Sequence, residues 1–218
     1  MHIPDGFVDL KIAITTGVMS AGGVAASIYK IKKVFKGKVI VLMGMMAALI
    51  FALQMINFTI PGGTSGHLLG GALVVITLGP YTGVLVLSIV LIVQALVFMD
   101  GGVIAIGANV FNMAICGVLS AFLIYILLKR ISKSKAMFYV ATAVASWCSV
   151  VAASTFAALE LGISGTYAMG VTLKTMVLVH MVIGVGEALI TTAIIAFIDR
   201  VRPDLILTRE NIYKKEAW

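Results

Sequence analysis

The chain has 218 residues, of which 61% are hydrophobic and 11% are charged, whereas an ordinary soluble domain is about 25% charged. This composition excludes a conventional water-soluble globule, and no stretch of mixed composition is long enough for a soluble ATPase, kinase or nucleic-acid-binding module. At roughly 20 residues per membrane-spanning helix, seven spans take about 140 residues and leave only short loops. We therefore predict an all-α, polytopic membrane protein that forms one compact domain over residues 1–218.

The net charge of +7 arises from 16 Lys and Arg residues, and all but Lys11 and Lys174 fall into three groups that each follow a long apolar run. The groups are Lys30, Lys32, Lys33, Lys36 and Lys38; Lys129, Arg130, Lys133 and Lys135; and Arg200, Arg202, Arg209, Lys214 and Lys215. Cytoplasmic loops beside membrane spans are enriched in Lys and Arg. We therefore interpret the basicity as membrane topology and expect no nucleic-acid partner.

Apolar runs between polar breaks predict seven membrane spans. They cover residues 8–29, 38–57, 67–79, 81–99, 103–128, 136–160 and 171–198. The third run has 13 residues, too few to cross a core of ~30 Å at 1.5 Å per residue, so we expect a tilted or partly buried helix whose ends are covered by protein. With seven spans, all three basic groups lie in the cytoplasm, the N-terminus lies outside and the C-terminus is cytoplasmic. The outward side then receives Asp5, Asp9, Asp100 and Glu160.

Small residues recur along the first span. Gly17, Ala21 and Ala25 lie at positions i, i+4 and i+8, a spacing that lets another helix approach closely. The stripe either packs within the chain's own bundle or forms a docking face for a partner membrane protein. The sequence does not decide between these two interpretations.

The N-terminus carries the donors of a metal chelate. The opening MHIPDGFVDL lacks the positive start of a signal peptide, so we expect it to be retained in the fold. A free amine at Met1, the amide nitrogen of His2 and the His2 imidazole would form two fused rings around one metal ion. His67, on the same outward side, would complete an all-nitrogen square plane, which favours Ni(II) or Cu(II) over Zn, Mg or Mn. Taken singly, His2 could be an accidental terminal residue and His67 could be a helix cap at the membrane interface. Together they predict a metal site.

The loop before the third span has the sequence TIPGGTSGH and is rich in glycine. Gly62, Gly63 and Gly66 allow this loop to fold back into the mouth of the bundle. Thr64 and Ser65 are placed to donate or accept hydrogen bonds around the metal ligands. The loop therefore supports the prediction that His67 reaches the chelate.

Polar residues also occur inside the predicted spans. His180 and Glu187 lie seven residues apart, on one face of the last helix, and Asn109 and Asn112 of the fifth span could partner them. Such residues are usually paired or functional. A structural polar cluster and a role beside the ligands or in ion transit are equally compatible with the sequence. His180 is not expected to be a direct ligand, because it lies about 14 Å below the outer end of its helix at 1.5 Å per residue.

The remaining motifs argue against enzymatic chemistry. Cys116 and Cys148 lie in apolar runs without a CxxC spacing, so we expect two small buried hydrophobic side chains. The sequence contains no GxxxxGK[ST] phosphate loop, no GxSxG and no HExxH. We therefore expect a protein that is not an enzyme, that cannot hydrolyse ATP through a phosphate loop and that needs no organic cofactor.

The opening MHIPDGF, the GGTSGH loop ending at His67, the seven spans and the small-residue first helix resemble the NikM/CbiM family. These proteins are the nickel/cobalt-specific substrate-binding (S) components of energy-coupling factor (ECF) transporters, and the resemblance covers essentially the whole chain. It implies that Met1, His2 and His67 capture the ion outside a prokaryotic cell membrane. It also implies a transmembrane coupling (T) component, ABC-type ATPase subunits that hydrolyse the ATP, and an S component that topples in the membrane.

The resemblance also leaves alternatives. Some members carry a fused membrane segment or use a small accessory membrane protein, which we expect here as a separate chain. The square-planar argument favours Ni(II) as the substrate ion, whereas Co(II) uptake for cobalamin synthesis is the nearest alternative. A metal sensor or a structural membrane subunit that never translocates is a different class of function. Transport predicts metal accumulation that depends on the ATPase, whereas a sensor or structural role predicts none.

Overall fold

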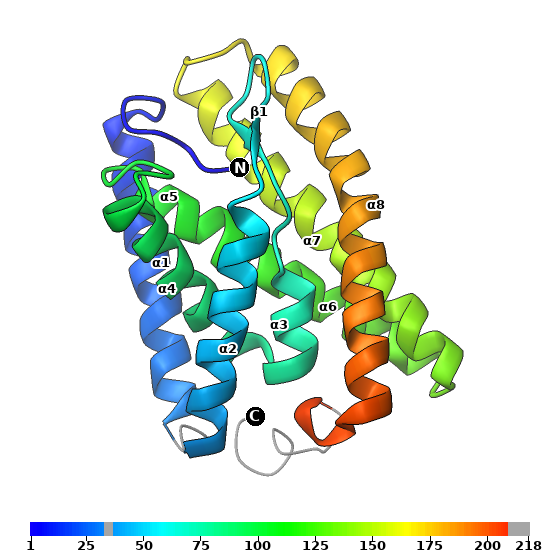
Figure 1. Cartoon of the computed structure of the whole chain (residues 1–218). Coiled ribbons are helices and arrows are strands. Elements are labelled where there is room, and N and C mark those ends of the chain that lie inside the picture. The colour runs from blue at the N-terminus through cyan, green and yellow to red at the C-terminus, as the bar shows by residue number, and fades with distance from the viewer. Residues whose placement is uncertain (33–36, 209–218) are drawn as a thin grey trace.

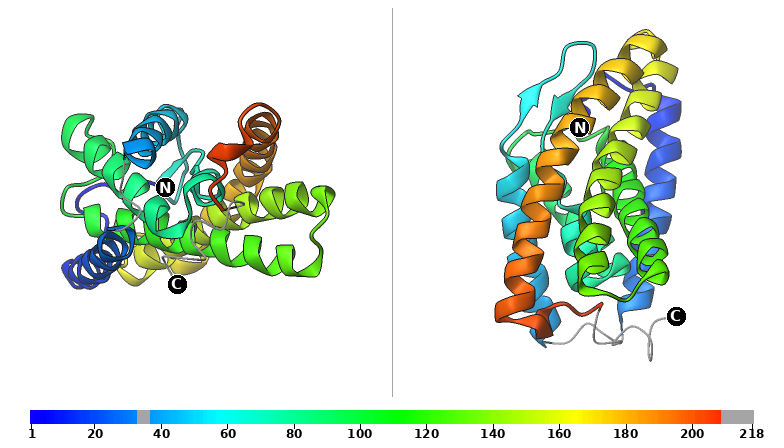
Figure 2. Two further views of the ribbon diagram at one scale, coloured as in Figure 1. Left: turned by 90° about the horizontal axis from the view of Figure 1, so that it is seen from below. Right: turned by 90° about the vertical axis from the view of Figure 1, so that its right-hand side faces the viewer.

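The protein is described from a computed structural model, which covers residues 1–32 and 37–208. Within these ranges, six helices are long and apolar enough to cross a membrane. They are α1 (Leu10–Ile31), α2 (Gly37–Gln54), α4 (Pro80–Val97), the continuous stretch Ile106–Ile131, α7 (Lys135–Ile163) and α8 (Met169–Val201). Figures 1 and 2 show them running side by side as an elongated bundle. The predicted all-α membrane class is confirmed, and its long runs match the helices closely.

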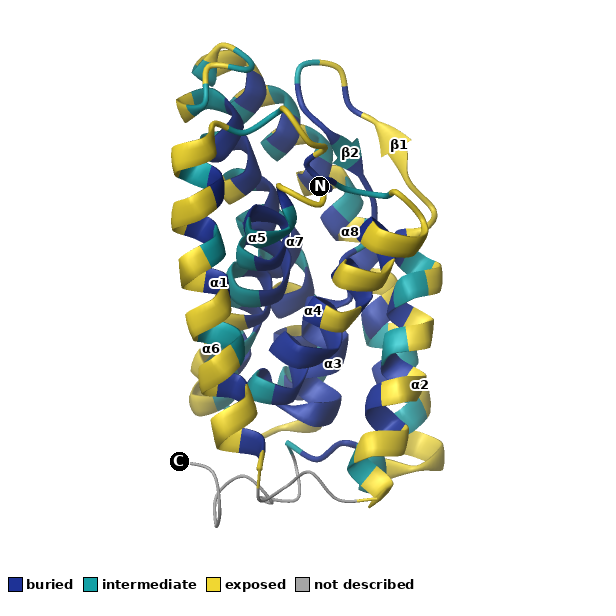
Figure 3. Cartoon of the chain, turned by 90° about the vertical axis from the view of Figure 1, so that its left-hand side faces the viewer, coloured by how far each residue is buried: buried dark blue, intermediate teal, exposed yellow. Residues whose placement is uncertain are grey.

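The third predicted run forms a short, buried helix, as expected from its length. It forms α3 (Gly71–Leu78), a helix of eight residues that are all buried, which spans only about 12 Å at 1.5 Å per residue. Figure 3 shows α3 in the middle of the bundle, enclosed by the longer helices. The structure therefore has six helices of spanning length among its described residues, and the seven crossings and the orientation of the termini stay predictions.

The long stretch Ile106–Ile131 is built from three pieces. It begins with α5 (Ile106–Asn109), continues as a π-helix, η1 (Val110–Gly117), and ends with α6 (Val118–Ile131). A π-helical segment inside a membrane-spanning helix often accompanies a functional site because it changes which side chains face inward. Here the junction lies at Asn109, a residue that contacts the N-terminal segment.

The bundle has two distinct ends. At the N-terminal end, Met1 contacts Ser65 and His2 contacts Asp100. This end also carries a two-residue antiparallel hairpin of β1 (Phe58–Thr59) and β2 (Ser65–Gly66). At the opposite end, the segment that contains the 3-10 turn η2 (Pro203–Leu205) closes over α3, because the Leu207 N–H donates to the Thr77 carbonyl oxygen at 2.9 Å.

The basic groups are only partly visible. Lys33, Lys36, Arg209, Lys214 and Lys215 lie outside the described residues. Of the described members, Lys38 and Arg202 both pair with Asp204 at the opposite end of the bundle.

The small-residue stripe of the first span divides between the two interpretations. Gly17 packs closely against Gly107, and the neighbouring Ser20 hydroxyl donates to the Gly107 carbonyl oxygen at 2.7 Å. Ala21 and Ala25 are exposed and point away from the bundle. The first part of the stripe therefore packs inside the chain, and the second part leaves an apolar face open.

Candidate metal centre

The N-terminal segment is fixed by side chains of the neighbouring loop and helix. The Ile3 N–H donates to Asn109 Oδ1 at 2.8 Å, and Asn109 Nδ2 donates to the Ile3 carbonyl oxygen at 3.0 Å. One amide side chain thus pairs with both polar groups of a main-chain residue, as a neighbouring strand would. The Asp5 carboxylate accepts hydrogen bonds of 2.7 to 3.1 Å from the backbone of residues 103–105. These contacts hold the chain start inside the mouth of the bundle.

Ser65 contacts both main-chain nitrogens of the predicted chelate. Its hydroxyl oxygen lies 2.8 Å from the Met1 amine and accepts from the His2 N–H at 3.1 Å. The Met1 amine also donates to the Ser65 carbonyl oxygen. Ser65 thus lies against both of these nitrogens, and its role around a metal ion stays a prediction. Thr64 is buried, but its hydroxyl has no hydrogen-bond partner within the described chain.

The glycines of this loop have different roles. Gly62 has φ +71°, in the left-handed region that favours glycine. Gly63 and Gly66 lie so close to the side chains of α8 that a Cβ would fall 2.6 Å from the Met176 sulfur and 2.9 Å from Ile183, respectively. The loop can therefore pack against α8 and turn inward toward the N-terminus.

Contacts to oxygen atoms hold both imidazoles. His2 Nε2 lies 3.1 Å from Gln94 Oε1 and His2 Nδ1 lies 3.2 Å from the Asp100 carboxylate, so both ring nitrogens of His2 face an oxygen acceptor. His67 Nδ1 donates to the Leu68 carbonyl oxygen at 2.7 Å, which leaves Nε2 as the lone-pair nitrogen. This Nε2 has no hydrogen-bond partner among the described residues. The ring centroids lie 4.4 Å apart, with planes inclined by 18°.

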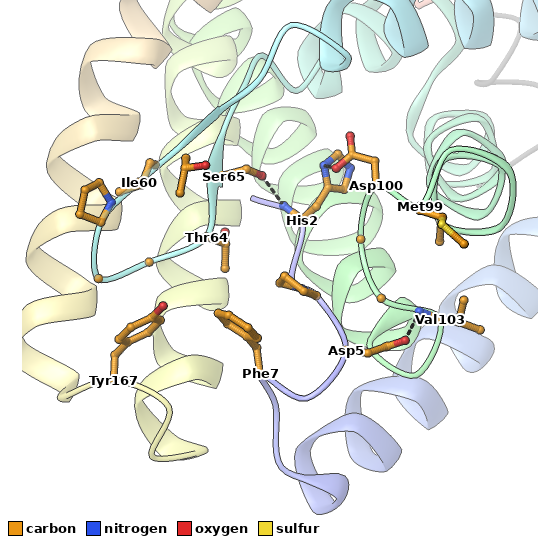
Figure 4. Close-up of a pocket in the computed structure, with 18 of the residues that line it drawn as sticks. His2, Asp5, Phe7, Ile60, Thr64, Ser65, Met99, Asp100, Val103 and Tyr167 are labelled. Carbon is orange, nitrogen blue, oxygen red and sulfur yellow. Dashed lines mark hydrogen bonds and ion pairs between the residues drawn. The ribbon is translucent and has the colours of Figure 1, made fainter.

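Gln94 and Asp100 are site residues that the sequence analysis missed. Gln94 is a buried amide on α4, and its position inside the apolar run VLIVQALV was the available signal. The Asp100 carboxylate lies 3.2 Å from His2 Nδ1 and accepts from Asn57 Nδ2 at 3.0 Å. Figure 4 shows Asp100 beside His2, with Ser65 on the other side. Asp100 thus places negative charge beside a candidate nitrogen donor.

Burial sets the protonation of the candidate donors. Desolvation holds the pKa of the Met1 amine well below its ordinary value, although the Asp100 charge opposes this. Desolvation also lowers the pKa of His67 strongly and that of His2 to a lesser degree. Partial burial alone would raise the pKa of Asp100, but its hydrogen bond and charge interaction with His2 bring the net value below the ordinary one. The site thus combines one carboxylate with three nitrogen donors whose neutral forms are favoured by burial, which suits a cation.

A pocket of about 680 Å³ opens next to these residues. Its lining includes His2, Asp5, Ser65, Asp100 and Tyr167, and Figure 4 shows them around the opening. A group of three or more His, Cys, Asp or Glu side chains arranged for a metal does not occur in residues 1–32 and 37–208. The candidate donor set instead consists of two imidazoles and two main-chain nitrogens.

The deeper polar residues do not pair as the sequence suggested. Asn109 holds the N-terminal segment, and Asn112 donates to Glu160 at 2.6 Å. Glu187 accepts from backbone groups of the loop before α3, and His180 Nδ1 bonds to a carbonyl oxygen of its own helix. The expected pairing of the two asparagines with His180 and Glu187 is wrong, because α8 packs mainly on α7 while α5 and η1 pack against α1 and α7. Glu160, expected on the outward side, is buried.

The cysteines lie away from this site. Cys116 and Cys148 are free and half-buried, on η1 and α7. Neither is among the residues lining the pocket. They are therefore less buried than the sequence predicted, and the structure brings neither to the candidate donors.

Known proteins resemble the chain over most of its length. Residues 2–205 match the family CbiM, described as the cobalt uptake substrate-specific transmembrane region. A protein of Archaeoglobus fulgidus, provisionally named fused nickel transport protein NikMN, is 44% identical over 94% of this chain and 68% of its own length. The cobalt transport protein CbiM of Lachnoclostridium phytofermentans is 34% identical over 62% of this chain and 55% of its own length. A crystal structure of a transition metal transporter matches with a TM-score of 0.89 at 30% identity, covering 99% of this chain and all of that one.

Proposed function

Because the chain belongs to the CbiM family of substrate-specific transmembrane regions, we propose that it captures Ni(II) outside the cell and delivers it inward as the S component of an ATP-driven ECF importer. Membership of this family agrees with the resemblance noted in the sequence. The two relatives described above are named as a nickel transport protein and a cobalt transport protein. The choice of ion, the direction and the partners are the parts that we propose here.

The observation that carries the proposal is the meeting of four nitrogen atoms from three residues. The Met1 amine and the His2 amide nitrogen share one hydroxyl contact, with Ser65. Nδ1 of His2 and Nε2 of His67 belong to rings whose centroids lie 4.4 Å apart, and each nitrogen offers a lone pair to a metal ion when it carries no proton. Binding through the amine, the deprotonated amide and Nδ1 closes a five-membered and a six-membered chelate ring. His67 then supplies the fourth donor.

The proposed all-nitrogen donor set supports nickel as the ion. Square-planar nitrogen coordination is typical of Ni(II) and Cu(II), whereas Mg and Mn prefer oxygen ligands and structural Zn is tetrahedral. Co(II) uptake for cobalamin synthesis is the alternative within the same family. Direct competition between Ni(II) and Co(II) at the purified protein distinguishes the two, because a planar nitrogen site should retain nickel.

The proposed partners fit the surface of the bundle. The exposed face around Ala21 and Ala25 on α1 offers a closely approachable helix surface for the T component. ATP hydrolysis belongs to separate ABC-type ATPase subunits, and a small accessory membrane protein is a further candidate partner. The presence of Lys38 and Arg202 at the opposite end supports a cytoplasmic position for that end, with the metal site facing outward.

The test uses the full chain with its native N-terminus. Purified alone, it should bind one Ni(II) with the absorption spectrum of a planar nitrogen site and show no nucleotide hydrolysis. Reconstituted with the T component and ATPases, it should accumulate nickel only when ATP is supplied. Robust ATPase activity of the isolated chain would defeat this division of labour. Metal binding without any ATP-dependent accumulation would instead favour the sensor or structural role.

A further inference from the structure

The loop that carries His67 is held from α8 by a buried carboxylate. Glu187 Oε2 accepts from the Leu69 N–H at 2.9 Å, and Oε1 accepts from the Gly70 N–H at 2.7 Å. Glu187 is 2% exposed, so its carboxylate and the backbone groups that it contacts are withdrawn from water. Gly70 is the N-cap of α3, has φ +79° and lacks a side-chain cap of its own. Glu187 therefore satisfies the N–H groups at the start of α3 from a distant helix.

The same peptide groups lead directly to His67. The carbonyl of Leu68 and the N–H of Leu69 belong to one planar peptide group. That carbonyl accepts the Nδ1–H of His67 at 2.7 Å, while the N–H donates to Glu187. Glu187, the peptide group and the imidazole thus form one hydrogen-bonded chain that ends at the free Nε2 of His67. In such a chain each hydrogen bond polarises the next.

The next peptide group is held from both sides. Its N–H, on Gly70, donates to Glu187, and its carbonyl, on Leu69, accepts from Gln54 Nε2 at 2.8 Å. Gln54 lies on α2 and is fully buried. Neither peptide group can rotate without leaving a buried polar atom unpaired, which is costly. The orientation of the His67 ring is therefore set by α2 and α8 together.

We propose that Glu187 is a positioning residue for the metal site, which acts through the Leu68–Leu69 peptide group to fix the tautomer and ring plane of His67. This inference rests on the proposed function, because it assumes that His67 Nε2 is the fourth nickel ligand. In many metal sites a carboxylate bonds directly to the ligating histidine and orients it. Here a main-chain peptide group stands between the two.

The test is Glu187→Gln in the full chain with its native N-terminus, loaded with Ni(II). The glutamine oxygen can accept a hydrogen bond from one of the two backbone N–H groups. Its NH₂ group would face the other N–H, which is also a donor, and must turn away. We expect nickel affinity to fall about 10- to 100-fold. The absorption spectrum should shift toward that of His67→Ala, because the three donors of Met1 and His2 remain while the fourth is misplaced. Glu187→Asp keeps the charge but shortens the side chain, so its nickel affinity and spectrum should fall between those of the wild type and Glu187→Gln.

A double variant shows whether Glu187 acts through His67. In the His67→Ala background, Glu187→Gln should cause no further loss of affinity. Glu160→Gln is the matched control, because Glu160 is also a buried glutamate but contacts Asn112 and not the His67 loop. Its affinity and spectrum should match the wild type. If Glu187→Gln does not fold, Glu187→Asp gives the same spectral readout.

The outcomes separate this inference from the proposed function. A wild-type spectrum and affinity in both Glu187 variants, with both changed in His67→Ala, overturn the inference and leave the ligand set intact. Additive losses in the double variant also overturn it, since Glu187 would then act independently of His67. An unchanged spectrum and affinity in His67→Ala would show that the proposed ligand set is wrong.

Discussion

The two ends of the bundle use polar residues in opposite ways. At the N-terminal end, the half-buried side chain of Ser65 and the buried side chains of Asn109 and Glu187 each bond to main-chain groups. At the opposite end, Lys38 pairs with Asp204, and these two side chains are 58% and 37% exposed, respectively. Buried polar groups are costly to leave unpaired, whereas exposed ion pairs contribute little to stability. Function and sensitivity to substitution should therefore concentrate at the N-terminal end.

The largest effect should follow from adding one residue before Met1. The buried Met1 amine would become an amide and lose its role as a terminal donor. We expect the extended protein to insert and fold normally, yet to bind nickel more than about 100-fold more weakly, since a direct ligand should matter more than its supporting contacts. Isothermal titration measures the loss, with a C-terminally tagged protein as the control. Equal affinity in the extended protein would remove Met1 from the ligand set.

Replacing His67 should have the next largest effect. His67→Ala removes the fourth nitrogen, and we expect nickel affinity to fall by about 100-fold. The matched comparison is the double variant Cys116→Ala and Cys148→Ala, whose half-buried thiols lie away from the pocket. The double variant should bind nickel as the wild type does. If titration instead shows binding lost without the cysteines and kept without His67, the donor set is not nitrogen-based.

Asn109 should matter through the main chain that it holds. Asn109→Ala leaves the N–H and carbonyl of Ile3 without their buried partner, so the N-terminal segment loosens. We expect a fall in nickel affinity of about tenfold, in the range of other residues that orient ligands. The control is Asn112→Ala, whose partner is Glu160, on α7. Equal effects of the two substitutions on affinity would mean that both act on the bundle as a whole.

The pH dependence near neutrality should reflect the proton lost by the His2 amide. Burial lowers the pKa of the Met1 amine and of both imidazoles and so favours their neutral forms, and we therefore expect the His2 amide to supply the proton released on binding. Affinity should therefore rise about tenfold per pH unit near neutrality, with about one proton released per nickel ion. Below the lowered pKa values, affinity should fall more steeply as the donors become protonated. Titrations in buffers of different ionisation enthalpy count the protons, and two or more at pH 7.5 would contradict this account.

The smallest effect is expected at the opposite end. Asp204→Asn removes the partner of Lys38 and Arg202 on an exposed surface. We expect unchanged nickel affinity and an unchanged Tm in detergent, because water screens these charges. A lower Tm would show that the segment closing over α3 depends on this ion pair.

The sequence predicted the long helices well because each apolar run is bounded by polar or small residues. The last run, 171–198, became α8 (Met169–Val201), and the first, 8–29, became α1 (Leu10–Ile31). The short third run also behaved as predicted, since its length alone forbids a full crossing. Helix bounds depend on local sequence, and local sequence is sufficient for them.

The partners of buried polar residues could not be predicted in the same way. Gln94 meets His2 across 92 positions of sequence, and Glu187 meets the Leu69 backbone across 118. Such contacts depend on how each helix is rotated about its axis and on the path of an irregular loop. The meeting of His2 with His67 was predictable only because the predicted topology put both residues on one side of the membrane. The contacts that orient them required the structure.

The burial of α3 has an electrical consequence. All eight residues of α3 lie among the longer helices directly below the His67 loop, where an ion channel would need water. Moving a bare ion through such an apolar interior is prohibitively costly. We therefore expect vesicles that contain this chain alone to hold an imposed voltage without measurable conductance. A cell could then display many copies of the protein while its proton gradient stays intact.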